Sequence, residues 1–359
     1  MEFKNTVLLG LAHHNSNDSM SSEEIEERMA PVYEGLKLPY GRLELMTGIK
    51  SREVWPKGTR PSDLSISAGK KLIEMYDINK SEIDLLIHAS VCRDFLEPST
   101  ASVVHYGLGL KEECMIFDLS NACLGVINAL VMAAQMIERG QIRNALIVSG
   151  ENSGPLLEET IHSLNEKVKN GELNRKNIKK YIANLTIGSA ATALLIGSKE
   201  KNPSAPCLAN AVVKTDSSAH VLCQGDGNPN SLMMETDSET LLHKGVTLAK
   251  KTFEEFKRNS GWSISDLSYV LTHQVGKAHE ELTLKALEVY NVPTYRTYPQ
   301  YGNTGSSALP LTLIKMVQDK TITLRPKEKI CLMGIGSGLT SIILGLEWGH
   351  LPLKERSYE

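Results

Sequence analysis

Short apolar segments alternate with longer amphipathic ones along almost the whole chain, in two similar rounds. In the first, we predict strands at 6–11, 83–89, 115–118, 145–149 and 191–196, and helices at 63–75 and 126–139. In the second, we predict strands at 208–213, 267–272, 330–334 and 340–346, and helices at 245–257 and 278–289. Buried strands covered by helices have this pattern. We therefore predict an α/β protein with halves at 1–199 and 200–359, which meet near the polar, proline-containing segment 197–206.

Charge and cysteine usage exclude several classes of protein. A net charge of -3 and a pI near 6.4 argue against nucleic acid as the main partner. The six cysteines contain no CxxC pair and no zinc-like spacing, and His13 and His14 lack further ligands, so we predict no metal site. No segment reaches the roughly 18 apolar residues of a membrane span, and no leader-like segment is present. We predict a cytoplasmic protein with reduced cysteines.

Cys123 is the candidate nucleophile. It lies where the strand-like segment 115–118 meets a turn of small residues, just before the predicted helix 126–139. The positive end of a helix dipole favours a thiolate over a thiol, so we expect Cys123 to be a nucleophile at neutral pH. A lone cysteine in an apolar segment is otherwise a packing residue in most proteins.

His273 and Asn303 complete a candidate Cys/His/Asn site. His273 follows the strand-like segment 267–272, and Asn303 lies in a glycine-rich loop at 301–307. Each alone has an ordinary structural explanation, but all three follow strands or turns, where α/β proteins place catalytic groups. The same chain order occurs in papain-like proteases, whose cysteine signature this chain lacks. A catalytically silent binding protein with the α/β fold predicted for this chain is a further alternative, which an intact Cys123 disfavours.

Four motifs carry a family resemblance over nearly the whole chain: Asn121 to Gly125, His273-Gln274, Gly302 to Thr304 and Gly334 to Thr340. In order and rough spacing they resemble the signatures of the ketoacyl synthase III branch of the thiolase superfamily, and Thr47 to Arg52 resembles that branch's Thr-Gly-Ile-x-x-Arg segment. The resemblance implies a five-layered α-β-α-β-α fold of two similar halves and a homodimer. It also implies that the backbone of Ser337 helps Cys123 to form an oxyanion hole.

Within that branch, Glu97 separates two activities. The segment Ser90 to Ser102 resembles the enzymes that condense two acyl-CoA molecules head to head in bacterial long-chain olefin biosynthesis, in which a glutamate from the partner subunit is the proposed base. Malonyl thioesters form a carbanion by losing carbon dioxide, whereas an ordinary acyl-CoA needs a base to remove its α-proton. Without the resemblance, Glu97 has an ordinary explanation as a solvated loop carboxylate or as a residue at the start of a helix, ahead of Pro98.

The resemblance therefore implies an acyltransferase that performs a Claisen condensation of two acyl-CoA molecules through an acyl-cysteine. His273 and Asn303 would stabilise the enolate. The alternative is a 3-oxoacyl-[acyl-carrier-protein] synthase III that uses malonyl-carrier protein to start fatty acid synthesis. CoA thioesters are substrates, and no cofactor is expected. Arg52 and Lys277 are candidates for contacts with CoA phosphates, and enzymes that process the β-keto product are implied as partners.

A charged helical segment at about 156–181 has two interpretations. It either forms a cap over the acyl channels, as insertions between first-half strands do in the resembling family, or is a solvated pair of helices.

Overall fold

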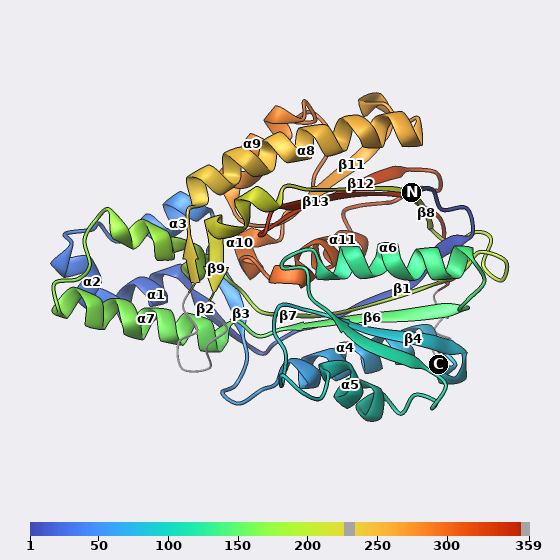
Figure 1. Ribbon diagram of the computed structural model, residues 1–359, viewed down its shortest axis with the longest axis horizontal. Helices are drawn as coiled ribbons and strands as arrows, with labels where there is room; N and C mark the ends of the chain where they lie inside the picture. Colours follow the sequence, from blue (N-terminus) through green and yellow to red (C-terminus); the bar gives the residue numbers. More distant parts are fainter. Residues whose placement is uncertain (226–233, 353–359) are drawn as a thin grey trace.

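The computed structural model describes residues 1–225 and 234–352. Its main sheet has the strand order β11-β12-β13-β8-β1-β7-β6-β4-β5 (Figure 1). The two central strands, β1 (Thr6–His14) and β8 (Cys207–Thr215), are paired through Val7 and Cys207. The strands on either side of this junction come from the two halves of the sequence. The division at residues 199 and 200 itself stays a prediction.

The first half of the sheet combines parallel and antiparallel strands. The strands beyond β1 are β7 (Ala190–Ser198), β6 (Asn144–Glu151), β4 (Ile83–Ala89) and β5 (Met115–Leu119). The ladders β4–β5 and β4–β6 are parallel, so the carboxyl ends of these strands lie at one edge. Helices α4 (Pro61–Tyr76) and α5 (Thr100–Leu108) cover one face. The residues that follow β4, β5 and β6 are thereby brought together.

The second half is built from β8, β13 (Thr340–Glu347), β12 (Lys329–Gly336) and β11 (Leu267–Thr272). The long helix α8 (Ser238–Ser260) packs on β8 and β13 and also contacts α9 (Lys277–Ala286). Phe253, Phe256 and Trp262 are buried between this helix and the sheet. Short 3-10 helices at Lys80–Glu82, Ser217–Leu222 and Ile264–Asp266 connect elements in the two halves.

Two apolar helices form the layer between the halves. Helix α6 (Gly125–Glu138) contacts β4, β6 and β7 from the first half and β13 from the second, and α11 (Ala308–Gln318) contacts β1, β7, β11 and β12. Most of their buried apolar residues belong to one core cluster with residues from both halves of the main sheet. Helices on both outer faces and between the two halves of the sheet give the five layers α-β-α-β-α visible in Figure 1. The predicted thiolase-type fold is confirmed.

A lobe of helices projects beyond the layers, at the left of Figure 1. It contains α1 (Ser22–Arg28), α2 (Ala30–Gly35), α3 (Arg42–Thr47), the paired strands β2 (Asp18–Ser21) and β3 (Ser51–Val54), helix α7 (Gly154–Lys169) and the 3-10 helix η2 (Asn177–Thr186). Leu157, Ile161 and Leu164 of α7 share a buried cluster with Ile25 and Val32. The charged segment at 156–181 is therefore packed on one face and is not a solvated helix pair.

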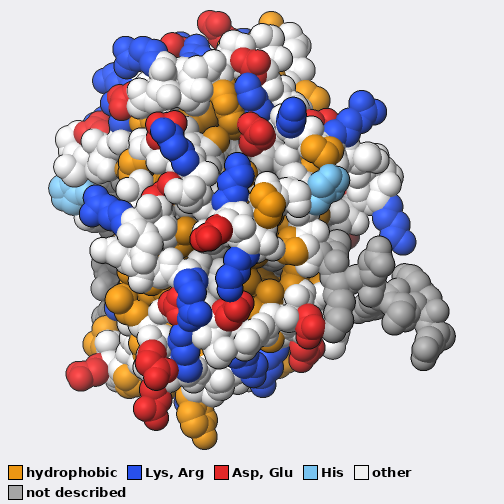
Figure 2. All heavy atoms as spheres, turned by 90° about the vertical axis from the view of Figure 1, so that its right-hand side faces the viewer, with side chains coloured by type: hydrophobic (Ala, Val, Ile, Leu, Met, Phe, Trp, Pro, Cys, Tyr) orange, Lys and Arg blue, Asp and Glu red, His pale blue; other side chains and the backbone are white. Residues whose placement is uncertain are grey.

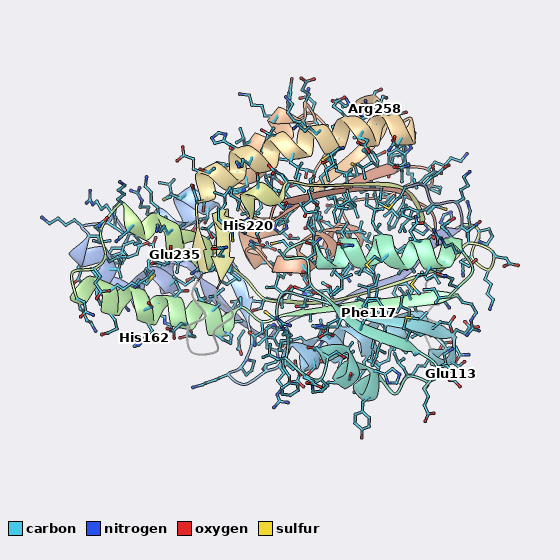
Figure 3. The ribbon with its side chains drawn as sticks, viewed as in Figure 1. Glu113, Phe117, His162, His220, Glu235 and Arg258 are labelled. Carbon is cyan, nitrogen blue, oxygen red and sulfur yellow. The ribbon has the colours of Figure 1, made fainter. Side chains whose placement is uncertain are left out.

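A short hairpin joins this lobe to the second half. Strands β9 (Cys223–Gly225) and β10 (Met234–Thr236) pair in antiparallel fashion. Glu235, labelled in Figure 3, accepts a hydrogen bond from Tyr181 at 3.0 Å and pairs with Lys180 at 3.2 Å. The hairpin is thus fixed to η2 beside the carboxyl-end edge of the sheet.

One lateral edge of the main sheet, at β5, is open. Strand β5 is terminal, and Phe117, labelled in Figure 3, lies on it. Among the described residues, no strand pairs with the outer edge of β5. Figure 2 shows that acidic and basic side chains are interspersed on the face turned to the viewer. In the described ranges, no helix is long and apolar enough to cross a membrane.

Candidate active site

One cavity brings together the three predicted catalytic side chains. It has a volume of about 380 Å³, and its wall includes Cys123, His273 and Asn303. Cys123 comes from the first half of the chain and the other two from the second, so the cavity lies where the halves meet. Leu156, Ile182, Met234, Leu241 and Leu242 form apolar parts of its wall. Leu156 belongs to the predicted insertion, which therefore contributes to the cover of the cavity.

The backbone at Cys123 is a constrained turn between β5 and α6. Strand β5 ends at Leu119 and α6 begins at Gly125, so Cys123 lies just before the helix. Ala122 has a φ of 46°, a left-handed conformation that side-chain-bearing residues rarely adopt. The Ser306 hydroxyl donates a hydrogen bond to the Ala122 carbonyl at 2.6 Å. The loop after Asn303 therefore holds the turn that presents the nucleophile.

The expectation that Cys123 is a thiolate at rest is wrong for this structure. Burial raises the pKa of the Cys123 thiol to about 12, and the nearby charges of Glu151 and Cys223 act in the same direction. A hydrogen bond from its own backbone N–H opposes them without prevailing. Because Cys123 precedes the helix inside a water-poor cavity, desolvation outweighs the helix dipole. The resting nucleophile is a thiol.

His273 is a neutral imidazole at the carboxyl end of β11. Its backbone N–H donates to the Met333 carbonyl at 2.9 Å, which continues the pairing of β11 with β12. Burial lowers the pKa of His273 to about 3, and His279 adds to the shift. Among the described residues, neither ring nitrogen has a hydrogen-bond partner. One nitrogen can therefore donate to a ligand while the other accepts.

Asn303 is oriented by its own loop. Its backbone N–H donates to the Thr186 carbonyl at 2.8 Å, and its carbonyl accepts from Gly188 at 2.9 Å. Its side-chain oxygen accepts the Gly305 N–H at 3.2 Å. This bond leaves the NH₂ group of the carboxamide to donate to a ligand. Gly302, at a φ of 65°, has no space for a side chain because a Cβ there would lie 2.7 Å from the Thr186 oxygen.

Ser337 also lies on the cavity wall, in the turn that follows β12. The preceding Gly336 allows β12 to pass close to the residue after the nucleophile, because a Cβ at Gly336 would lie 2.9 Å from the Leu124 side chain. The glycine-rich segment thus approaches the nucleophile turn, as an oxyanion hole made by the backbones of Cys123 and Ser337 requires.

Four further titratable residues, which the sequence patterns do not single out, line the cavity: Cys92, Glu151, Cys223 and His279. Glu151 ends β6, whose parallel neighbour β4 precedes the Ser90–Ser102 segment. Its position at the carboxyl end of a buried parallel strand was a usable signal. His279 lies six residues after His273, and burial lowers its pKa as well.

Glu97 and the two predicted CoA contacts lie in different environments. Glu97 is exposed, and it is not part of the cavity wall of its own chain. Lys277 does line the cavity, and its side chain is 59% exposed. Arg52 is completely buried, and its guanidinium donates to the Ser22 hydroxyl at 3.1 Å. A contact between Arg52 and CoA phosphates does not fit this position, because the side chain is enclosed by protein.

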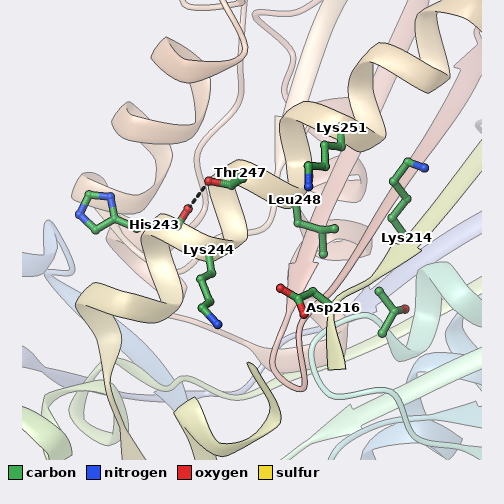
Figure 4. Close-up of a pocket in the computed structure, with 8 residues that line it drawn as sticks. Lys214, Asp216, His243, Lys244, Thr247, Leu248 and Lys251 are labelled. Carbon is green, nitrogen blue, oxygen red and sulfur yellow. Dashed lines mark hydrogen bonds between the residues drawn. The ribbon is translucent and has the colours of Figure 1, made fainter. Parts of the chain in front are cut away.

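A second hollow, of about 670 Å³, lies beside α8 and the end of β8 (Figure 4). Lys244 and Lys251 lie around Asp216, and Lys214 at the same hollow pairs with Glu255 at 2.6 Å. Its wall contains no cysteine, and none of the three predicted catalytic side chains belongs to it. In the described part of the chain, no group of three or more potential metal-ligating side chains is present.

A thiolase-type fold with a partly exposed cysteine, a neutral histidine and an asparagine on the wall of one cavity defines a class of acyltransferases that form acyl-cysteine intermediates. A family model for 3-oxoacyl-[acyl-carrier-protein] synthase III matches residues 117–164. A second model, for the C-terminal part of that family, matches residues 258–348. An acyl-CoA:acyl-CoA alkyltransferase of Xanthomonas campestris is 34% identical over 97% of this chain and all of the relative. One of Shewanella oneidensis is 35% identical with the same coverage. The chain belongs to the 3-oxoacyl-[acyl-carrier-protein] synthase III family.

Solved structures of Xanthomonas campestris OleA have the same fold. A cysteine-to-alanine variant superimposes with a TM-score of 0.91 at 33% identity, over 97% of this chain and 98% of that chain. A cysteine-to-serine variant with bound lauric acid and lauroyl-CoA has a TM-score of 0.89 at 34% identity, over 96% and 100% of the two chains. Other structures of that protein carry substitutions of a glutamate and of a histidine.

Proposed function

We propose that this chain condenses two acyl-CoA molecules through an acyl-Cys123 intermediate to a β-ketoacyl product. The observation that carries the proposal is the shared cavity of Cys123, His273 and Asn303, whose apolar wall suits acyl chains. The relatives named acyl-CoA:acyl-CoA alkyltransferase, and the lauroyl-CoA bound to one of them, support an acyl-CoA substrate. The residue types substituted in the solved relative match three of the proposed groups: a cysteine, a histidine and a glutamate.

In the first half-reaction, Cys123 takes the acyl group. Because burial keeps both the thiol and His273 neutral at rest, the imidazole would relay the thiol proton to the departing CoA sulfur as the Cys123 sulfur attacks the thioester carbon. The bond between the acyl carbon and the CoA sulfur then breaks, and CoA leaves with the proton. Backbone N–H groups of Cys123 and Ser337 would hold the oxyanion, and one such donor typically contributes about 10²–10³ in rate.

In the second half-reaction, a base removes the α-proton of another acyl-CoA. We assign this role to Glu97, supplied by the partner subunit. The enolate oxygen would accept hydrogen bonds from neutral His273 and from the NH₂ group of the Asn303 side chain. This NH₂ group is available because the Gly305 N–H binds the oxygen of the same carboxamide. The carbanion attacks the acyl-Cys123 carbonyl, and the cysteine leaves. The product keeps the CoA of the second substrate.

The exposed surface near β5 supports a homodimer. Large apolar side chains are exposed on the loop before α5, on α5 and on β5: Val91 at 52%, Phe95 at 37%, Leu96 at 91%, Tyr106 at 88% and Met115 at 51%. They lie beside the open edge of the sheet, and an apolar surface next to an unpaired strand is a site for association. A partner on this surface would cover the loop that contains Glu97, and by twofold symmetry each subunit would supply its loop to the other.

The remaining predictions concern the setting of the reaction. Lys277 is our candidate for a phosphate contact, because it is an exposed cation on the cavity wall. All six cysteines are free of disulfide bonds, which suits the predicted cytoplasmic location. Use of an acyl carrier protein, and enzymes that process the β-keto product, stay predictions.

The decisive test is incubation with acyl-CoA as the sole substrate. Mass spectrometry should find an acyl group on Cys123 and a β-ketoacyl product. Glu97→Gln should keep the acyl-cysteine and lose condensation by about 10²–10⁴-fold, the usual contribution of a general base. Glu112→Gln is a matched control, because Glu112 is an exposed carboxylate outside the cavity wall. If wild-type protein makes product only with malonyl-carrier protein, the chain is a decarboxylating synthase instead.

A further inference from the structure

Glu151 is a buried carboxylate in the catalytic cavity that the proposed mechanism does not use. Its residue is 4% exposed, yet it belongs to the cavity wall. In the described ranges, no lysine, arginine or histidine forms an ion pair with it. Burying a carboxylate without a cation is costly unless other donors compensate it, so its retention at this place calls for an explanation.

Three backbone N–H groups from two separate loops compensate this carboxylate. One oxygen accepts from Val91 at 2.9 Å and from Ser306 at 3.0 Å, and the other accepts from Cys92 at 3.2 Å. Hydrogen bonds to an ionised acceptor are stronger than those between neutral groups. The glycine at 305 makes this approach possible, since a Cβ there would lie 3.0 Å from a Glu151 oxygen. Glu151 therefore joins the two loops across the cavity.

Each of the joined loops leads to a group assigned to condensation. Ser306 lies three residues after Asn303, and its hydroxyl also holds the Ala122 carbonyl at 2.6 Å. Val91 and Cys92 begin the segment that leads to Glu97. The contacts thus connect three parts of the site: the Asn303 loop, the turn that presents Cys123, and the start of the loop that contains Glu97. A displacement of about 1 Å in such groups can cost about 10²-fold in rate.

We propose that Glu151 is a positioning residue for condensation: it fixes the Asn303 loop and the start of the Glu97 loop relative to Cys123. The proposal rests on the proposed function, because the roles of Asn303 and Glu97 come from it. The charge of Glu151 has a second, separately measurable consequence. It acts on the Cys123 thiol together with Cys223, and it raises the thiol pKa. The other titratable groups on the cavity wall are Cys92, His273, Lys277 and His279.

Two substitutions separate charge from length. Glu151→Gln keeps the length and one acceptor oxygen but removes the charge and places an NH₂ group against backbone donors. Glu151→Asp keeps the charge and shortens the side chain. Glu26→Gln is the matched control, because Glu26 is also buried and accepts a backbone N–H, from Leu43 at 2.6 Å, but does not line the cavity. Thermal unfolding of all variants checks that they fold.

Three readouts are measured on the full chain: acyl-Cys123 formation, β-ketoacyl turnover, and alkylation of Cys123 by iodoacetamide followed by peptide mass spectrometry. For Glu151→Gln we expect turnover to fall by about 10–100-fold, acyl-Cys123 formation to change by less than about threefold, and alkylation at about pH 8 to accelerate several-fold. For Glu151→Asp we expect the turnover loss without the faster alkylation. Glu26→Gln should leave all three near wild type.

The proposal is overturned if Glu151→Gln condenses within about twofold of wild type, or if acylation and condensation fall together with alkylation unchanged. The second result would assign Glu151 to general stability. If wild-type protein makes no product from acyl-CoA, the proposed function fails. The alkylation comparison then still decides whether the Glu151 charge acts on Cys123, with a faster rate in Glu151→Gln supporting its placement and an equal rate contradicting it.

Discussion

The cavity around Cys123 and the surface around Glu97 differ in how complete they are within one chain. Cys123, His273 and Asn303 share one enclosed space and are held by backbone contacts from both halves. Glu97 lies on an exposed loop beside Leu96, which is 91% exposed, next to an open sheet edge. The difference teaches that one chain contains the proposed acyl-transfer groups, whereas the proposed base would have to act from a second chain.

The largest effect should come from the nucleophile. Cys123→Ala should remove the acyl-enzyme and lower condensation by at least about 10³-fold, because Cys123 is the thiol presented by the turn before α6 that we assign as the acyl acceptor. Intact-protein mass spectrometry after mixing with acyl-CoA measures the first effect, and product formation the second. Cys207→Ala is the control, since Cys207 lies outside the cavity wall. An acyl group on the Cys123→Ala protein would assign the nucleophile elsewhere.

The next largest effect should come from the enolate donor. Asn303→Ala should lower condensation by about 10²–10³-fold, the usual loss for one oxyanion donor. Acyl-Cys123 should still accumulate, because Asn303 acts in the second half-reaction. Rapid-quench measurements of both steps give the two rates. Equal losses in both steps would show that Asn303 mainly holds the loop that supports the nucleophile turn.

A smaller effect is expected at the exposed surface around Glu97. Leu96→Asp should weaken the proposed dimer by about 10–100-fold, because a carboxylate would be buried in an apolar interface. Analytical ultracentrifugation over a range of concentrations measures the dissociation constant. Leu45→Asp is a matched control at a leucine that is 82% exposed away from the β5 edge. An unchanged dimer would place the interface on another surface.

The last prediction concerns the pH dependence of the nucleophile, which requires no substitution. Since the Cys123 pKa is about 12, the thiolate fraction should rise about tenfold for each pH unit between about pH 8 and pH 10. Alkylation of Cys123 should accelerate in proportion over this range. A rate that levels off below about pH 8 would mean that the thiolate forms at neutral pH, as the sequence analysis expected.

Periodicity was sufficient to predict several strands and helices of this fold, the resemblance implied its five layers, and neither predicted the electrostatics of its site. The predicted segments at 83–89 and 267–272 match β4 and β11 residue for residue, because both strands are buried runs with clear polar ends. The sequence was sufficient to group Cys123, His273 and Asn303 as a candidate site, because each follows a strand or lies in a turn. The thiolate expectation was wrong because desolvation depends on which distant segments enclose Cys123, and local sequence does not contain that information.

Arg52 and Glu151 also show that local sequence does not predict the burial of a side chain or its distant partners. The sequence makes Arg52 a candidate for a contact with CoA phosphates, yet β3 places its side chain in full burial. Glu151 was overlooked because its partners, Val91, Cys92 and Ser306, are distant in sequence and use backbone N–H groups that no side-chain pattern records. Glu97 was singled out by resemblance alone, and its environment in one chain does not distinguish a base from a solvated carboxylate.

The most direct test of the central claim is a mixed dimer of Cys123→Ala and Glu97→Gln subunits, purified through two different tags. Each variant alone should be inactive in condensation. If Glu97 acts across the interface, the mixed dimer contains one site with an intact cysteine and an intact partner glutamate, and it should regain about half of the wild-type activity. A mixed dimer as inactive as its parents would contradict the account, because both groups would then have to come from the same chain.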